Sequence, residues 1–174
     1  MEKYLYTSNK NKGDCNFVLA YPESEEFALS SLGYMGLFQL ADTSEGINAV
    51  RISTDNPRIP FKDIDGIAFS LSFDFDFTGV FKILEINNIP FKSSERSDDL
   101  PLVFAGGPVI TTNPAPYCQI FDFMLIGDGE KSFSSVLEII KQGGNKKDIL
   151  KKLSKIEGVY VPGVNKSVKN LSES

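Results

Sequence analysis

The amino-acid sequence, 174 residues long, contains no histidine. Without an imidazole it cannot carry out Ser-His-Asp hydrolysis, bind zinc through histidine, or give a metal cofactor a histidine ligand. The two cysteines, Cys15 and Cys118, are too few for a four-Cys zinc site or an iron–sulfur cluster. Because no histidine can activate them, we expect both thiols to be inert. Their scarcity favours a reduced, cytoplasmic environment over a disulfide scaffold.

The chain also lacks an excess of positive charge and a long apolar run. Its 18 Lys and Arg residues against 23 Asp and Glu residues leave a net charge of −5, which provides no basic surface for nucleic acid. No stretch reaches about 18 uncharged apolar residues, and the N-terminus lacks the apolar core of a signal peptide. We therefore expect one globular, cytoplasmic domain with neither a nucleic-acid nor a membrane partner.

What the sequence does contain is a repeated alternation of short apolar runs and helical stretches. Strands are predicted at 16–21, 47–52, 66–72, 101–105, 121–126 and 159–162. Helices are predicted at 27–41, 73–84, 115–120, 130–142 and 146–153. Nearly continuous apolar strands separated by helices are typical of a parallel sheet that is covered on both faces. The sequence therefore predicts an α/β fold with a doubly wound, open parallel sheet.

Two of the predicted helices carry further expectations. In 27–41 apolar residues occupy most faces, so we expect this helix to be well buried, and Gly33 and Gly36 suggest close packing against a neighbouring element. In 73–84 one helical face collects the apolar side chains, which are Phe73, Phe77, Val80, Phe81 and Leu84. Asp74 and Asp76 then lie near the N-terminus of that helix, where negative charge is favourable.

In doubly wound sheets, ligands bind beyond the carboxyl ends of the strands, where the strand order reverses. Four turns are expected there, and each is most simply a strand-to-helix connection. Together, their small residues leave an open surface on which backbone amides approach a large, flat or phosphorylated ligand. The candidate cofactor-binding residues are Tyr21, Pro22, Ser70, Leu71, Ser72, Gly106, Gly107, Pro108, Gly127, Asp128, Gly129 and Glu130. The sequence nominates no catalytic or metal-binding residue.

Known nucleotide motifs are missing from these turns. No Gly-Lys-Ser/Thr occurs, which excludes a P-loop. The first turn, Tyr21 to Glu26, has no glycine and carries three carboxylates, which would repel a pyrophosphate. A classical NAD or ATP domain is therefore not expected.

Six motifs, taken in order, resemble a known family. They are Tyr21-Pro22, Ser30 to Gly33, Phe69 to Ser72, Ala105 to Pro108, Asn113 to Pro116, and Ile126 to Glu130. The series is similar to the N-terminal domain of radical S-adenosylmethionine (SAM) proteins that have a cobalamin-binding-like domain ahead of the catalytic barrel. This resemblance implies a Rossmann-like or flavodoxin-like fold of the cobalamin-binding type over residues 15–163. A 1–14 extension would precede it, and a 164–174 disordered tail or linker to a missing barrel would follow.

The resemblance also implies how the chemistry is divided. The catalytic barrel of the family holds a 4Fe-4S cluster on Cys-x-x-x-Cys-x-x-Cys and uses S-adenosylmethionine, and the chain has no such motif. Radical chemistry would then belong to a barrel joined in cis or acting in trans. Cobalamin domains of the methionine-synthase type carry a histidine after the first strand, and here the matching turn has none. Cobalamin would therefore bind without a protein lower ligand.

Three functions remain open at this stage. In the first, a corrinoid lies over the sheet edge: Ser70 and Ser72 bond its nucleotide tail, the strand-end glycines clear space, and Glu130 caps the last helix or bonds the ligand. A bulky residue at Gly107 or Gly127 would then abolish binding and leave the fold intact. In the second, the domain has lost the cofactor and docks on a radical SAM core. Bulky side chains such as Phe73, Tyr117 or Phe121 would then fill the strand-end cleft. The third is an independent flavin- or nucleotide-binding protein.

Overall fold

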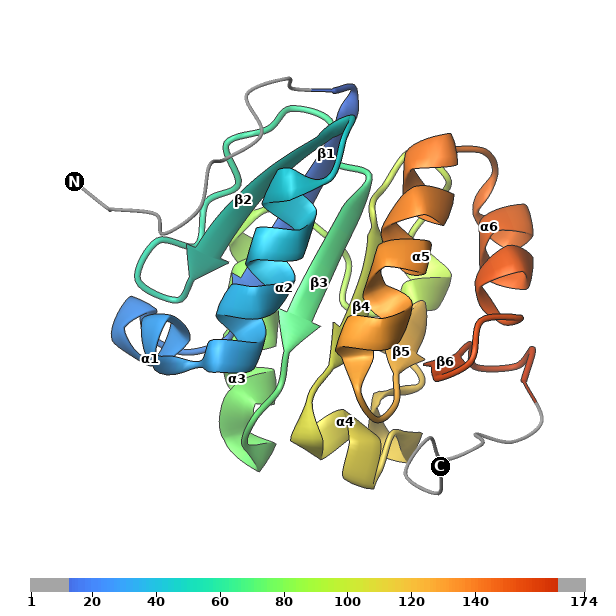
Figure 1. The fold of residues 1–174 in the computed structure, drawn as a ribbon. Coiled ribbons are helices and arrows are strands. Elements are labelled where there is room, and N and C mark those ends of the chain that lie inside the picture. Colours follow the sequence, from blue (N-terminus) through green and yellow to red (C-terminus); the bar gives the residue numbers. More distant parts are fainter. Residues whose placement is uncertain (1–12, 166–174) are drawn as a thin grey trace.

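A six-stranded sheet forms the centre of the molecule in the computed structural model, which describes residues 13–165 (Figure 1). Its strands are β1 Cys15–Tyr21, β2 Ile47–Ser53, β3 Gly66–Ser70, β4 Leu102–Gly106, β5 Phe123–Leu125 and β6 Val159–Tyr160. They lie in the order β2-β1-β3-β4-β5-β6, all parallel except for β6, which is antiparallel to β5. The predicted doubly wound α/β fold is confirmed, with one antiparallel strand added at the edge.

Helices cover both faces of this sheet. They are α1 Glu25–Ser30, α2 Leu32–Thr43, α3 Phe77–Ile86, α4 Pro108–Thr112, α5 Gly129–Gln142 and α6 Lys146–Leu153, with short 3₁₀ turns η1 Asp74–Asp76, η2 Ser93–Glu95 and η3 Ala115–Tyr117. In Figure 1, α2 and α5 lie side by side in front of the sheet, and α3 lies behind it. The predicted extension up to residue 12 and the predicted tail from residue 166 lie outside the described residues.

The alternation of side chains along each strand builds a separate apolar core on each face. On β1, Phe17 and Leu19 belong to the core beneath α2, α5 and α6, whereas Val18 and Ala20 belong to the core beneath α3 and α4. The aromatic rings of Phe104 and Phe123 stack in the first core with their centroids 4.3 Å apart. Of the helices in the described residues, none is long and apolar enough to cross a membrane.

The predicted helix 27–41 is in fact two helices that meet at Ser31. This residue has extended backbone angles, and its hydroxyl accepts a hydrogen bond of 3.4 Å from the Tyr34 backbone N–H. A serine that caps the start of a second helix ends the first one. The spacing of apolar residues does not show such a break. The prediction that this helix is well buried is wrong, because Phe27, Leu29 and Leu32 are 58%, 47% and 88% exposed.

The expected close packing at Gly33 and Gly36 is also wrong. A Cβ atom placed on Gly33 would meet nothing within 4 Å, and one on Gly36 would meet only the Glu130 carboxylate, at 3.7 Å. Replacing Gly36 by alanine is therefore expected to raise the free energy of unfolding by about 0.5–1 kcal/mol, since alanine loses less backbone entropy in a helix. Urea unfolding monitored by circular dichroism measures the change. Gly33→Ala should gain less stability, because Gly33 lies in the first turn of the helix. A loss of stability in Gly36→Ala would contradict the finding that a Cβ atom at position 36 has room.

The third helix starts later than predicted. Phe73 is extended, η1 follows it, and α3 begins only at Phe77. The buried face is formed by Val80, Ile83 and Leu84, so the prediction that Phe73 and Phe77 share it is wrong; Phe73 is 65% exposed. The cause is the Asp76 carboxylate, which accepts backbone N–H bonds from Ser72 at 2.6 Å and Phe73 at 2.9 Å. These bonds hold the chain in a turn before the helix starts.

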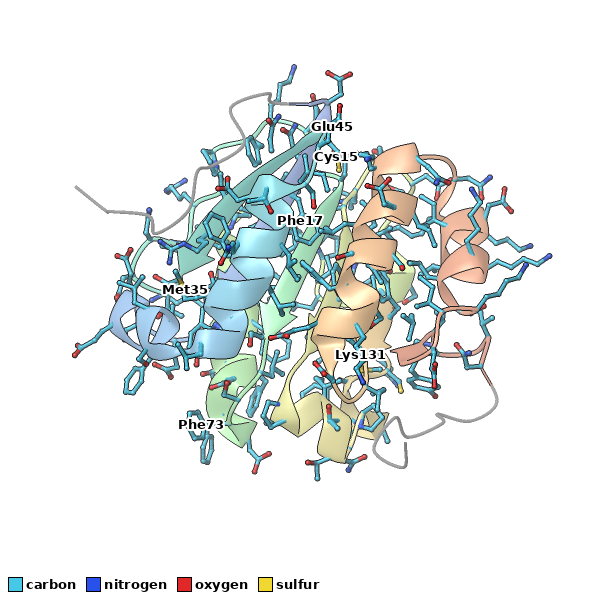
Figure 2. All side chains as sticks on the ribbon, in the orientation of Figure 1. Cys15, Phe17, Met35, Glu45, Phe73 and Lys131 are labelled. Atoms are coloured by element: carbon cyan, nitrogen blue, oxygen red, sulfur yellow. The ribbon has the colours of Figure 1, made fainter. Side chains whose placement is uncertain are left out.

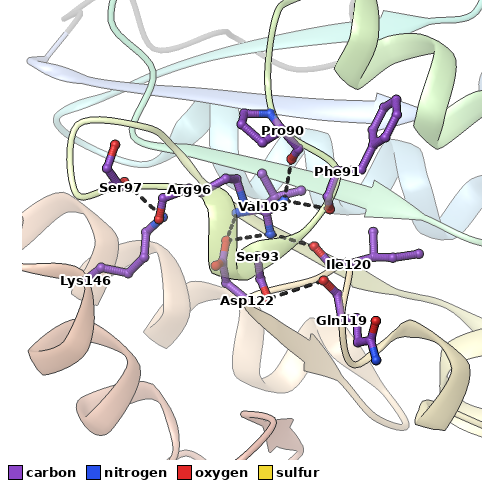
Figure 3. Close-up of polar contacts among 10 residues, drawn as sticks. All are labelled: Pro90, Phe91, Ser93, Arg96, Ser97, Val103, Gln119, Ile120, Asp122 and Lys146. Carbon is purple, nitrogen blue, oxygen red and sulfur yellow. Dashed lines mark hydrogen bonds and ion pairs between the residues drawn. The ribbon is translucent and has the colours of Figure 1, made fainter.

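A buried ion pair fixes the long connection between α3 and β4 to the start of β5 (Figure 3). The Arg96 guanidinium lies 3.2 Å from the Asp122 carboxylate, and it donates to the carbonyls of Pro90 and Phe91 at 2.9 and 3.1 Å. Asp122 also accepts a 2.7 Å bond from the Val103 backbone N–H on β4. Burial lowers the pKa of Arg96 and raises the pKa of Asp122, although each charge partly offsets the effect on the other.

Candidate functional site

A cavity of about 320 Å³, here called the strand-end pocket, opens at the carboxyl ends of β1, β3, β4 and β5. It is bounded by the N-terminal parts of α2 and α5 and lies where the strand order reverses, between β1 and β3. In Figure 1 the strands point downward, and the ends of α2 and α5 that border the pocket are the lower ones. The reversal point is where open α/β sheets bind their ligands.

The pocket exists because small residues occupy its floor and walls. Across the sheet, Leu19 on β1 is in register with Ala68 on β3, which is in register with Phe104 on β4. The methyl group of Ala68 therefore leaves a depression between two large side chains. Two glycines, Gly33 on α2 and Gly106 on β4, add no side chain to the walls. The resulting space is apolar at its base.

The structure brings most of the predicted site residues together around this pocket. Those that line it are Ser70, Ser72, Gly106, Gly107, Pro108, Gly127, Asp128, Gly129 and Glu130. The remaining three lie beside or behind it. The Tyr21 hydroxyl is 3.4 Å from the Ser72 hydroxyl, and Pro22 is buried against Gly79 of α3.

Leu71 lies in the turn that follows β3, and Gly107 lies in the turn between β4 and α4. The Leu71 side chain is buried in the core beneath α3 and α4, and its backbone N–H donates to the Gly106 carbonyl at 2.9 Å. Gly107 has φ +111°, and a Cβ atom there would lie 2.4 Å from the Leu71 carbonyl oxygen. The expectation that a bulky residue at Gly107 would spare the fold is therefore wrong, because only glycine fits this backbone.

Polar groups gather at the mouth of the pocket. Asp128 caps α5, since its carboxylate accepts a 3.3 Å bond from the Glu130 backbone N–H. The Gly127 backbone N–H donates to the Thr111 hydroxyl at 3.0 Å, which ties α4 to the turn after β5. The Glu130 side chain is exposed, and it is not the cap of α5. The mouth thus offers hydroxyl and carboxylate groups around an apolar interior.

Sequence reasoning missed the wall that α2 contributes. Ser31, Gly33, Tyr34 and Leu37 all line the pocket, and the Tyr34 hydroxyl donates to the Leu19 carbonyl at 3.0 Å. The serine within the predicted helix was the available signal, because serine is favoured at a helix start. The approach of α2 to α5 is a tertiary contact that no local pattern encodes.

The bulky side chains that would fill the cleft in a docking domain lie elsewhere. Phe73 points away from the molecule in Figure 2, and Phe121 is buried in the core beneath α3 and α4. Tyr117 lines a different hollow. None of these three side chains therefore fills the strand-end pocket.

Neither of the two cysteines lines the strand-end pocket. Burial raises the pKa of the Cys15 thiol to about 12, with a further contribution from Asp65, so this cysteine stays protonated. Within residues 13–165, no group of three or more Cys, Asp and Glu side chains is placed to hold a metal ion.

The fold and the pocket define an open, doubly wound α/β domain with a ligand-sized cavity at its switch point. The chain belongs to the family described as "Radical SAM proteins, N-terminal", whose model matches residues 39–162. The match includes the motifs from Phe69 to Glu130 and excludes Tyr21-Pro22 and Ser30 to Gly33. No curated protein and no solved structure matches the chain.

Proposed function

We propose that this domain is an accessory, non-catalytic module that binds a corrinoid and presents it to a radical SAM catalytic domain, in cis or in trans. The nucleotide tail would enter the strand-end pocket, and the ring would lie over the strand ends. The observation that carries the proposal is an apolar cavity at the switch point with a polar mouth. Bound cobalamin would supply alkyl-transfer chemistry at its cobalt.

The size of the pocket supports this division of the ligand. Small-molecule pockets range from about 300 to 1,000 Å³. At about 320 Å³ the strand-end pocket suits an aromatic base with its ribose and is too small for a whole corrinoid. The apolar floor of Leu19, Ala68 and Phe104 complements the face of such a base.

Several residues of the chain have defined tasks under this proposal. Ser70 and Ser72 are placed at the wall to hydrogen-bond the tail, and the exposed Glu130 carboxylate at the mouth can accept bonds from ribose hydroxyls. Gly106 and Gly129 keep the mouth open. Because the sequence contains no histidine, no imidazole can replace the displaced base of the cofactor.

An absorbance titration with hydroxocobalamin, followed by gel filtration, tests the proposal. We expect a saturable spectral change with a 1:1 endpoint and colour that stays with the protein. Ala68→Leu fills the floor and Gly33→Phe fills the wall, so each is expected to weaken binding about tenfold or more, which corresponds to about 1.4 kcal/mol. Gln39→Phe, which adds the same ring to an exposed position of α2 outside the pocket, should bind like the wild type.

If the wild-type chain retains no corrinoid while its circular dichroism shows a folded domain, corrinoid binding is refuted. The second candidate function is then docking on a radical SAM core without a cofactor. One observation favours this second candidate: large apolar side chains, Leu32 and Phe75, are 88% and 79% exposed. Riboflavin 5′-phosphate and ATP, titrated in the same way, test the flavin or nucleotide alternative.

A further inference from the structure

A second hollow lies beside the strand-end pocket. It measures about 330 Å³ and is lined chiefly by Ser72, Asp74, Thr112, Asn113, Pro116 and Tyr117. We call it the polar hollow. Ser72 and Pro108 border both cavities, so the two adjoin across the turns that follow β3 and β4. A ligand seated at the strand ends can therefore reach both.

The polar hollow is lined in part by a sequence motif to which the proposed function assigns no role. The Asn-Pro-Ala-Pro segment, Asn113 to Pro116, follows α4 and forms one side of the hollow. The Asn113 side-chain oxygen accepts a 3.2 Å bond from the Ala115 backbone N–H, which turns the chain into η3. This bond leaves the Asn113 amide N–H groups as donors.

The polar hollow combines acceptors and donors. Asp74 is exposed and makes no ion pair with any residue between 13 and 165, so its carboxylate is available as an acceptor. Partial burial, together with the charges of Asp74 and Asp76, raises the pKa of Tyr117. The Tyr117 hydroxyl therefore keeps its proton at neutral pH and is available as a donor. Thr112 is engaged already, because its hydroxyl donates to the Pro108 carbonyl at 2.8 Å.

A carboxamide matches this set, since its N–H groups need an acceptor and its carbonyl needs a donor. We propose that the polar hollow is a subsite for carboxamide groups of the ligand, with Asp74 accepting their N–H bonds and Tyr117 and Asn113 donating to their carbonyls. This inference rests on the proposed function, because corrinoids carry carboxamide side chains around the ring. It assigns specificity to residues outside the strand-end pocket.

Comparing two corrinoid ligands distinguishes the contribution of the polar hollow to binding from that of the strand-end pocket. Hydroxocobalamin has both the amide-bearing ring and the nucleotide tail, whereas dicyanocobinamide has the ring without the tail. Asp74→Ala and Tyr117→Phe should each weaken both ligands by the same factor, about two- to tenfold for one hydrogen bond. Gly33→Phe in the strand-end pocket should weaken hydroxocobalamin alone. Asp63→Ala removes an exposed carboxylate that lines neither cavity, so it controls for the change in charge.

The measurement is the dissociation constant of each ligand from absorbance titration, with thermal unfolding to verify that each variant is folded. Wild-type affinity of Asp74→Ala and Tyr117→Phe for both corrinoids would overturn the subsite and leave the proposed function standing. Loss of hydroxocobalamin binding alone in these variants would also overturn it, since the hollow would then contact the tail. If the wild type binds neither corrinoid, the proposed function fails, and the subsite fails with it.

Discussion

Replacing Arg96 by methionine is expected to lower the free energy of unfolding by about 3–5 kcal/mol, because it leaves a buried carboxylate without its countercharge. The Arg96 and Asp122 side chains are 0% and 3% exposed, so water cannot take over the role of the guanidinium. The carbonyls of Pro90 and Phe91 lose their donor at the same time. Urea unfolding of both proteins at neutral pH measures the loss.

The loss should depend on pH with a defined sign. Burial raises the pKa of Asp122 in the folded state, so the fold favours the protonated carboxyl, and its contribution to stability declines as the pH rises through that pKa. Without Arg96 this pKa rises further. The difference between wild type and variant should therefore be smaller at about pH 5.5 than at about pH 8.

A matched control exists at an exposed pair. Lys92 and Glu95 are 3.9 Å apart and more than half exposed, so Lys92→Met should change stability by no more than about 1 kcal/mol. If Arg96→Met were equally mild, the buried pair would not be what fixes the connection between α3 and β4. A variant that is equally destabilised at both pH values would contradict the role of the Asp122 charge.

Gly107→Ala is expected to cost about 3 kcal/mol or more, the second large effect. At φ +111° an alanine is strained, and its Cβ atom would lie 2.4 Å from the Leu71 carbonyl oxygen, which is backbone and cannot rotate away. The turn between β4 and α4 would have to shift. Thermal or urea unfolding shows the loss directly.

The neighbouring turn supplies the control. A Cβ atom on Gly129 would lie 3.7 Å from the Leu125 side chain, an ordinary contact, so Gly129→Ala should change stability by less than about 0.5 kcal/mol. Equal stability of the two alanine variants would refute the close approach of Gly107 to Leu71. Corrinoid binding by Gly107→Ala is informative only after its folding has been measured, which is why Gly33 and Ala68 are the better positions for blocking the pocket.

The strands were predictable because apolar runs such as 16–21 are closed by turn-forming residues, and the structure shifts their ends by only a few positions. Helix α4 was missed: its residues, Pro108–Thr112, are too few to show a helical period. The antiparallel direction of β6 was missed as well, since two residues carry no signal of direction.

For the candidate site, the turns could be predicted and the cavity could not. Strand ends such as Ser70 and Gly106 follow from the parallel order, because that order brings them to one edge. The depression over Ala68 depends on which residues stand beside it in register, namely Leu19 and Phe104. Register is set by tertiary packing and by distant parts of the chain, so a single sequence leaves it open.

The order in which the strands pair has a consequence for the synthesis of the protein. Among the strands of this sheet β1 is synthesised first, yet Cys15 pairs with Ile47 and Phe17 pairs with Gly66, so β1 must wait for both partners. The floor of the pocket needs Phe104 as well, and it cannot form before β4 has emerged. The strand-end pocket is thus expected to be absent from the nascent domain until β4 has been synthesised, and a ligand can occupy it only after the central sheet is nearly complete.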